Sequence, residues 1–105
     1  MKTPLLSYDT EARLLQLAAR LKARRIERGD TQAQFAARMG VSIPTLAAME
    51  RGDAKTRIGY WLEAITLLGR FDDIDRILIE QSSLFDELPT RARQRMRARP
   101  AKKAR

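Results

Sequence analysis

Basic side chains without acidic neighbours are concentrated at the carboxyl end of this chain, where their chemistry would be the neutralisation of phosphate groups. The chain has 105 residues and a net charge of +8, yet residues 1–88 hold 13 Lys and Arg against 13 Asp and Glu. The whole excess is carried by Arg91, Arg93, Arg95, Arg97, Arg99, Lys102, Lys103 and Arg105. Contacts between such cations and phosphates release counterions, so they contribute an affinity for nucleic acid that weakens steeply with salt. The alternative is a solubilising tail that binds nothing.

The chain lacks the residue types on which most catalytic and metal sites depend. It contains neither cysteine nor histidine. Zinc and most transition metals are held by these two residues, and histidine is the usual general base. We therefore expect no enzyme, no cofactor and no metal. The apolar runs are too short to span a bilayer and the start of the chain lacks a signal-peptide core, so a cytoplasmic protein without membrane contact is expected.

One stretch, residues 31–52, has the pattern of two short helices joined by a tight turn. Thr31 can cap the first helix, in which Phe35, Ala36 and Met39 recur at helical spacing. Gly40 tolerates the left-handed backbone conformation that ends many helices. This first half therefore predicts a short helix with one apolar face.

The second half of the stretch repeats these signals after Val41, which we expect to fill the corner between the helices. Ser42 can cap the second helix, and Pro44 falls in its first turn, where a missing amide hydrogen costs nothing. Leu46 and Met49 are expected to face the core, and Gly52 closes the element. Two short helices that cross at a glycine turn describe a helix-turn-helix. A simple helical hairpin is the alternative.

The rest of the chain supplies the elements that must position this motif, and its apolar spacing predicts an all-α fold of five helices. We expect an extended N-terminal arm over residues 1–9, a compact domain over residues 10–80, and a flexible tail over residues 81–105, apolar and then basic. The first helix should be capped by Asp9 or Thr10 and run to about Arg28. Its expected buried residues are Leu14, Leu17, Ala18 and Leu21.

The fourth and fifth helices are expected to close the core. Thr56 is the predicted cap of the fourth, whose apolar face comprises Ile58, Trp61, Leu62, Ile65 and Leu68. We interpret Trp61 as a core residue rather than a platform for base stacking. A short fifth helix is expected over residues 72–81, directly after Phe71, with an apolar face of Ile74, Ile77 and Leu78 that Phe71 could join. That face could pack on the domain itself or on a second subunit.

The 31–52 stretch resembles the helix-turn-helix of the Cro/C1-type (XRE) repressor family. The residues that match the family pattern in one ungapped run are Thr31, Gln32, Phe35, Ala36, Gly40, Val41, Ser42, Thr45, Leu46, Glu50 and Gly52. The resemblance implies a compact lambda-repressor-like domain whose second motif helix, the recognition helix, lies in the major groove of DNA. Such a protein would be associated with the nucleoid when it is bound to DNA.

The resemblance also implies roles for individual residues in DNA contact. Gln32 and Ser42 take positions that contact phosphates. The base-facing positions are Ile43, Pro44 and Thr45, followed one turn later by Ala47 and Ala48. The flanking backbone would be held by Lys55 and Arg57. Arg38 and Arg51 are weaker candidates for the same contact, with ordinary surface charges as the alternative. Because no Arg, Asn or Gln occupies a base-facing position, we expect modest direct readout, with specificity drawn from DNA shape and dimer spacing.

A structural ion pair is a further implication of the resemblance. Arg25 falls where these repressors place an arginine that pairs with the glutamate near the end of the recognition helix, here Glu50. The alternative is two separate solvated charges. Asp30 departs from the family pattern, which has an apolar residue at that position, and we expect only a local effect.

Partners follow from the same resemblance. We expect a homodimeric, autoregulatory repressor that binds an inverted-repeat operator in double-stranded DNA. The layout of a compact domain and an apolar-basic tail is also similar to HipB-like antitoxins. That likeness implies a second reading, in which Leu84, Phe85 and Leu88 dock on a HipA-like toxin kinase. A third reading is sequence-independent binding of nucleic acid through the tail arginines, Arg91, Arg93, Arg95, Arg97 and Arg99.

Overall fold

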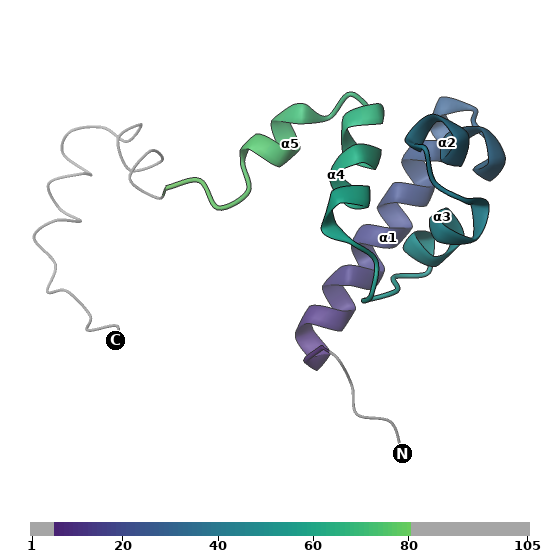
Figure 1. Ribbon diagram of the computed structural model, residues 1–105. Coiled ribbons are helices and arrows are strands. Elements are labelled where there is room, and N and C mark those ends of the chain that lie inside the picture. The colour runs from purple at the N-terminus through teal and green to yellow at the C-terminus, as the bar shows by residue number, and fades with distance from the viewer. Residues whose placement is uncertain (1–5, 81–105) are drawn as a thin grey trace, which may run out of the picture. The chain divides into compact units, whose positions relative to one another are not determined.

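The computed structural model describes residues 6–80, and these residues form helices and connecting turns without a strand. The five helices are α1 (Tyr8–Arg28), α2 (Gln32–Met39), α3 (Ile43–Glu50), α4 (Ile58–Leu67) and α5 (Phe71–Asp75). Figure 1 shows α1 as the longest of them, with α2, α3 and α4 gathered along it. The predicted all-α class and the number of helices are therefore confirmed.

The core is built by apolar residues from the first four helices. α2 contacts both α3 and α4, and α1 contacts α3. The buried apolar side chains are Ala18 and Leu21 of α1, Phe35, Ala36 and Met39 of α2, Leu46 and Met49 of α3, and Trp61 and Ala64 of α4. Trp61 is thus a core residue, as its spacing predicted. Burial of a large apolar side chain contributes roughly 1.5–3 kcal/mol, so this small set provides most of the stability of the domain.

The start of α1 differs from the sequence expectation. Its cap is Ser7, whose hydroxyl oxygen accepts a hydrogen bond from the Thr10 amide at 3.2 Å, rather than Asp9 or Thr10. Asp9 instead lies in the first turn, where its charge suits the positive end of the helix dipole. Tyr8 and Asp9, which were expected in the arm, therefore belong to α1. Leu17 was also expected to be buried, but 37% of it is exposed because it lies at the edge of the packed face.

The start of α4 differs for a local reason. The amide of Thr56 donates to the Asp53 carbonyl oxygen at 3.3 Å within the preceding turn, so the predicted cap is wrong. The helix begins after Arg57, whose side chain makes no capping hydrogen bond. Ile58 then occupies the first turn and is 73% exposed, because the core begins one turn later at Trp61.

The fifth helix is much shorter than predicted. After Asp75 the chain turns, and Leu78 adopts the left-handed conformation with a φ of 61°, which no helix can continue. None of the residues of α5 is buried. Phe71, Ile77 and Leu78 are 57%, 59% and 96% exposed, which disfavours the alternative in which this face packs on the core. The other alternative, packing on a second subunit, stays a prediction. Leu6–Ile74 belong to one compact unit, and Asp75 begins a separate one.

Candidate nucleic-acid interface

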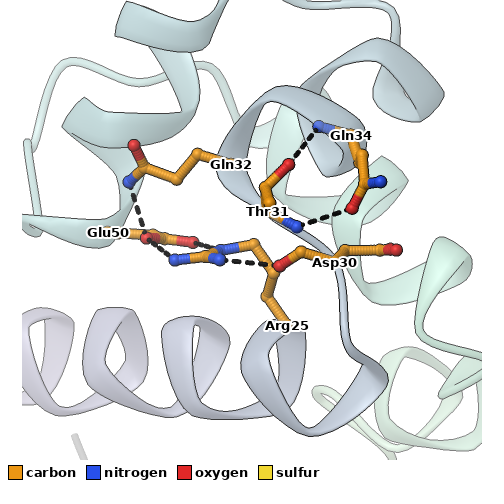
Figure 2. A network of polar contacts seen from close by, with 6 residues as sticks. All are labelled: Arg25, Asp30, Thr31, Gln32, Gln34 and Glu50. Carbon is orange, nitrogen blue, oxygen red and sulfur yellow. Dashed lines mark hydrogen bonds and ion pairs between the residues drawn. The ribbon is translucent and has the colours of Figure 1, made fainter.

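The first helix of the motif, α2, is held at both ends by its own residues. The Thr31 hydroxyl oxygen accepts from the Gln34 amide at 3.1 Å, and the Gln34 side-chain oxygen accepts from the Thr31 amide at 2.9 Å (Figure 2). This reciprocal capping box satisfies two backbone donors that a helix start otherwise leaves open. At the other end Gly40 has a φ of 79°, and the Val41 amide donates to the Ala36 carbonyl oxygen. The turn into α3 is thereby fixed.

The recognition helix, α3, starts at a polar cap. The Ser42 hydroxyl oxygen accepts from the Thr45 amide at 3.2 Å, and the two hydroxyl oxygens of Ser42 and Thr45 lie 2.9 Å apart. If Thr45 donates in that second contact, the hydroxyl hydrogen of Ser42 stays available for a phosphate oxygen. Pro44 lies in the first turn of α3, as predicted.

The outer surface of α3 is mostly apolar. Leu46 and Met49 are fully buried, so the residues on the opposite side of the helix point away from the core. Ile43 is 46% exposed, Pro44 is exposed, and Thr45, Ala47 and Ala48 are half-buried. These residues present methyl and methylene groups and one hydroxyl group, which suits contact with thymine methyl groups rather than bidentate hydrogen bonding.

One charged residue accompanies this apolar surface. Arg51 follows the last residue of α3 and is exposed, and it lies four residues after Ala47, on the same side of the helix. The sequence reading left it open between a weaker candidate for backbone contact and an ordinary surface charge. Its position one turn beyond a base-facing residue is the signal that could have identified it as a candidate for contact with DNA.

Three helices meet at the carboxylate of Glu50. Arg25 of α1 donates to it twice, from Nε to Oε2 at 2.7 Å and from Nη2 to Oε1 at 3.1 Å (Figure 2). Gln32 of α2 donates from Nε2 to Oε1 at 3.0 Å. The side chains of Arg25 and Glu50 are only 8% and 3% exposed. The structure therefore contains the ion pair that the resemblance implied, in a nearly buried and bidentate form.

The charges in this network are tuned by their neighbours. Burial by itself raises the pKa of Glu50, but the hydrogen bonds from Arg25 and Gln32 and the positive charges of Arg25 and Lys22 outweigh it, so the net pKa lies below the usual range. The hydrogen bond to Glu50 raises the pKa of Arg25 above its ordinary value. Both groups are therefore charged at neutral pH.

Gln32 has a structural role in addition to the phosphate contact expected of it. The sequence reading assigned its amide group to a phosphate, but one of its hydrogens is used by Glu50 within the protein. An amide nitrogen carries two hydrogens, so one donor remains for DNA. Gln32 thus joins the start of α2 to the end of α3, and any phosphate contact it makes is coupled to that junction.

Asp30 is integrated into the fold although it departs from the family pattern. Its side chain is 8% exposed and lies 2.8 Å from Arg28 Nε and 4.0 Å from Arg38 Nη2. Its backbone carbonyl oxygen also accepts from Arg25 Nη1 at 2.8 Å. Two cations thus offset the cost of a nearly buried carboxylate at a position where an apolar residue was expected. Arg38 is therefore not simply a solvated charge.

Sequence reasoning missed a second contact made by Arg28. Its Nη1 donates to the backbone carbonyl oxygen of Leu67 at 2.7 Å and so ties the end of α1 to the last turn of α4. Because the acceptor is a backbone atom 39 residues away, no pattern of side-chain types predicts this contact.

The loop after α3 presents two cations near the flank of the motif. The Lys55 amide donates to Asp53 Oδ1 at 2.8 Å, a local turn that leaves the Lys55 side chain exposed. The guanidinium carbon of Arg57 lies 5.9 Å from the centre of the Tyr60 ring, within the range of a cation–π contact. The five tail arginines Arg91, Arg93, Arg95, Arg97 and Arg99, and the apolar group of Leu84, Phe85 and Leu88, lie outside the described residues.

Comparison with known families decides the class of this motif. Residues 16–76 match the family model described as a helix-turn-helix domain, which spans more than half of the chain. The chain belongs to the helix-turn-helix domain family. The match supports a DNA-binding regulator, and domains of this family are typically not enzymes. Searches of curated proteins and of solved structures gave no significant match.

Two further findings concern the part of this helix-turn-helix protein that the structure describes. Among residues 6–80, no group of three or more Asp or Glu side chains could hold a metal ion. Within the same range, no helix is both long enough and apolar enough to cross a membrane.

Proposed function

We propose that this protein is a Cro/C1-type (XRE) transcriptional repressor that binds an inverted-repeat operator as a dimer, with its own promoter as the first target. The observation that carries the proposal is the combination of a rigidly held α3 with an exposed, uncharged outer surface at Ile43 and Pro44. A helix of this kind enters the major groove with its first residues against the base edges.

The hydrogen bonds that hold both ends of α3 support its role as a recognition helix. The Ser42 cap defines the start of α3, and the hydrogen bonds to Glu50 define its end relative to α1 and α2. Because the recognition helix is already ordered in the free protein, binding to DNA does not lose affinity to the entropy cost of ordering it. Base contacts are assigned to Ile43, Pro44, Thr45 and Ala48, and phosphate contacts to Gln32, Ser42, Lys55 and Arg57.

The tail adds an electrostatic contribution in this proposal. Residues 1–88 have no net charge, so the cations from Arg91 onward supply the attraction to DNA over distance. Arginines on a chain segment that follows the domain also suit a narrow minor groove. Their removal should lower both the affinity and its dependence on salt.

A charge placed on the recognition helix tests the proposal directly. Pro44→Glu puts a carboxylate on the exposed start of α3, where the helix dipole tolerates it, so the fold should survive. We expect binding to the DNA upstream of the gene to fall by at least about 100-fold, because the new charge faces DNA phosphates and base-edge acceptors. The matched control is Gln16→Glu on α1, which adds the same charge at an exposed position away from α3.

The measurement is fluorescence anisotropy with the upstream DNA and with a scrambled duplex, over a series of salt concentrations. The full chain and a version that ends at Gln81 are compared. A repressor prefers the upstream DNA in both versions, with a shallower salt dependence after truncation. If neither version discriminates between the duplexes, or if Pro44→Glu binds as well as the control, the proposal is rejected.

The alternative is a HipB-like antitoxin that binds a HipA-like toxin kinase, with autorepression as part of the same operon. It is favoured by the apolar group Leu84, Phe85 and Leu88, which stands directly before the basic segment. A kinase-like reading frame beside the gene, and capture of its product by the full chain but not by the version ending at Gln81, would support it.

A further inference from the structure

The helix α1 carries an apolar strip that the core of the described residues leaves largely exposed. Tyr8, Leu15 and Ile26 are 85%, 51% and 57% exposed, and Ala19 and Lys22 are also exposed. Ala12 is half-buried. We name these six residues the α1 strip. Three of the six residues are large apolar side chains that share one side of the helix.

The spacing of the α1 strip is that of a coiled-coil seam. The six positions follow one another at intervals of four, three, four, three and four residues, which are the a and d positions of a heptad repeat. At 100° per residue they fall within about 80° of one another around the helix. Such a strip is as wide as one partner helix.

The strip is distinct from the face with which α1 packs on its own domain. The buried residues of α1 are Ala18, Leu21 and Arg25, which at 100° per residue lie roughly a quarter-turn or more away from the middle of the strip. A Cβ atom at Gly52 would lie 2.8 Å from Leu15 Cδ2, so the end of the motif borders the strip at Leu15 without covering it. The intramolecular core therefore leaves most of this face exposed.

The first two turns of α1 precede the residues that match the helix-turn-helix family. The family match begins at residue 16, whereas α1 begins at Tyr8. In Figure 1 these turns project past α3 and α4 at the purple end of the helix. Within this extension Leu14 packs against the core, whereas Tyr8 at its start is 85% exposed.

The charges along the strip select a second copy of α1 as its partner. Glu11 flanks the strip near its start, and Lys22 lies within it near its end. When two such helices pack antiparallel, Glu11 of each comes next to Lys22 of the other, and the bulky Leu15 lies opposite the small Ala19. Parallel packing would instead place like charges side by side. A polar residue within a seam is also a means of fixing register.

We propose that two copies of the chain associate through antiparallel packing of their α1 strips, about a two-fold axis that crosses the seam midway between Leu15 and Ala19. The proposal rests on the dimeric repressor described above and assigns its interface. The stem of Lys22 contributes apolar contact while its ammonium group reaches Glu11 of the other copy. Because the strip is only one helix wide, we expect a dissociation constant on the order of micromolar.

Engineered cysteines test the orientation, because the chain has none of its own. In the antiparallel arrangement Ala12 of one copy lies opposite Lys22 of the other, whereas the two copies of Ala12 are about 15 Å apart along the axis. A mixture of full-length Ala12→Cys and Lys22→Cys proteins in a glutathione redox buffer should therefore form a mixed disulfide dimer. Each protein alone should form none, since a disulfide needs Cα atoms closer than about 7 Å. Cross-linking of Ala12→Cys with itself, or no cross-link in the mixture, would overturn the proposal.

A charge at the centre of the strip tests the interface itself. Ala19→Arg places two arginines against the opposing Leu15 residues and should weaken dimerisation by at least about tenfold, as measured by sedimentation equilibrium. The matched control Leu17→Arg adds the same charge on the part of α1 turned away from the strip and should dimerise like the natural chain. A natural chain that is monomeric throughout the micromolar range, or equal dimerisation of both variants, contradicts the proposal.

Binding to single and paired half-sites separates this inference from the proposed function. Ala19→Arg should keep its affinity for a duplex with one operator half-site and lose the cooperative gain on a duplex with two. If the natural chain dimerises through the strip but prefers no DNA, the repressor proposal fails and the interface stands. If DNA is bound specifically while the strip variants behave like the natural chain, the interface fails alone.

Discussion

Arg25 and Glu50 are 25 residues apart in the sequence, yet two hydrogen bonds of 2.7 Å and 3.1 Å join them across α1 and α3. Because both side chains are nearly buried, the loss of one partner strands the charge of the other. Arg25→Met should therefore lower the free energy of unfolding by roughly 3–5 kcal/mol in urea denaturation. The control Arg24→Ala removes an exposed pair with Glu27 and should cost less than about 1 kcal/mol.

A double variant tests whether the cost of Arg25→Met comes from the stranded charge. Arg25→Met combined with Glu50→Leu removes both charges and should recover much of the lost stability, because buried ion pairs are often replaceable by apolar residues. A double variant as unstable as the sum of the single variants would show that the two residues act independently. The same urea denaturation series measures all four proteins.

Stability should fall in acid through Glu50. The pKa of Glu50 in the fold lies below its ordinary value of 4.5, so the unfolded chain holds the proton more tightly. The contribution of Glu50 is therefore complete above the ordinary value and is lost as the pH falls through the lower, folded value. In urea denaturation between about pH 6 and pH 3, the free energy of unfolding should decrease less for Glu50→Gln than for the natural chain. Equal pH dependence in both proteins would refute this assignment.

The two partners of the Asp30 pair should respond unequally to replacement. Asp30→Leu exchanges a nearly buried carboxylate for an apolar residue, so we expect the free energy of unfolding to change by no more than about 1 kcal/mol. Arg28→Ala leaves that carboxylate with only the distant Arg38 and also frees the Leu67 carbonyl oxygen, for a cost of about 2 kcal/mol. Thermal and urea denaturation would measure the difference, and equal costs would count against this account.

Gly40 and Gly52 offer a matched pair of glycine variants. Both have a φ near +80°, so alanine should cost about 1–2 kcal/mol at either position from the left-handed backbone alone. A Cβ at Gly40 meets nothing within 4 Å, but at Gly52 it lies 2.8 Å from Leu15 Cδ2. Gly52→Ala should therefore be the more destabilising, and Leu15→Ala in the same chain should remove the excess. A Gly40→Ala variant that is the less stable of the two would reject the close approach.

The cations of the loop after α3 should affect DNA affinity but not sequence preference. Lys55→Ala and Arg57→Ala should each reduce the slope of log affinity against log salt by about 1, because each removes one phosphate contact. The ratio between operator and scrambled duplex should remain. A change in that ratio would assign the residue to base contact instead.

The motif itself could be predicted well from the sequence. The helical spacing of Phe35, Ala36 and Met39 identified the buried face of α2, and the caps at Thr31 and Ser42 have the geometry that their residue types predicted. These features are local, so short-range pattern carries the information. The pairing of Arg25 with Glu50 is long-range, and it was accessible only through resemblance to a family. The DNA-contacting roles remain predictions.

The features that sequence reasoning missed arise where several residues could cap the same helix, where a turn contains no glycine, or where the contact is made by a backbone atom. Ser7, Asp9 and Thr10 are all good caps, and the sequence does not say which of them ends in an extended conformation. The left-handed conformation occurs at Leu78 rather than at a glycine, so the sequence did not indicate it and α5 was predicted to continue. The partner of Arg28 is a carbonyl group, which every residue possesses.

The position of Glu50 also determines how the domain can open. Its carboxylate belongs to α3 but accepts hydrogen bonds from α1 and α2, so no one of these helices can unravel at this junction without breaking a bond to another. Backbone amides in the three helices should therefore exchange their hydrogens with solvent in one cooperative event, at close to the free energy of global unfolding. α5, which has no buried residue, should exchange far sooner. DNA would then meet the two motif helices as a single preformed body, and binding would need no folding step.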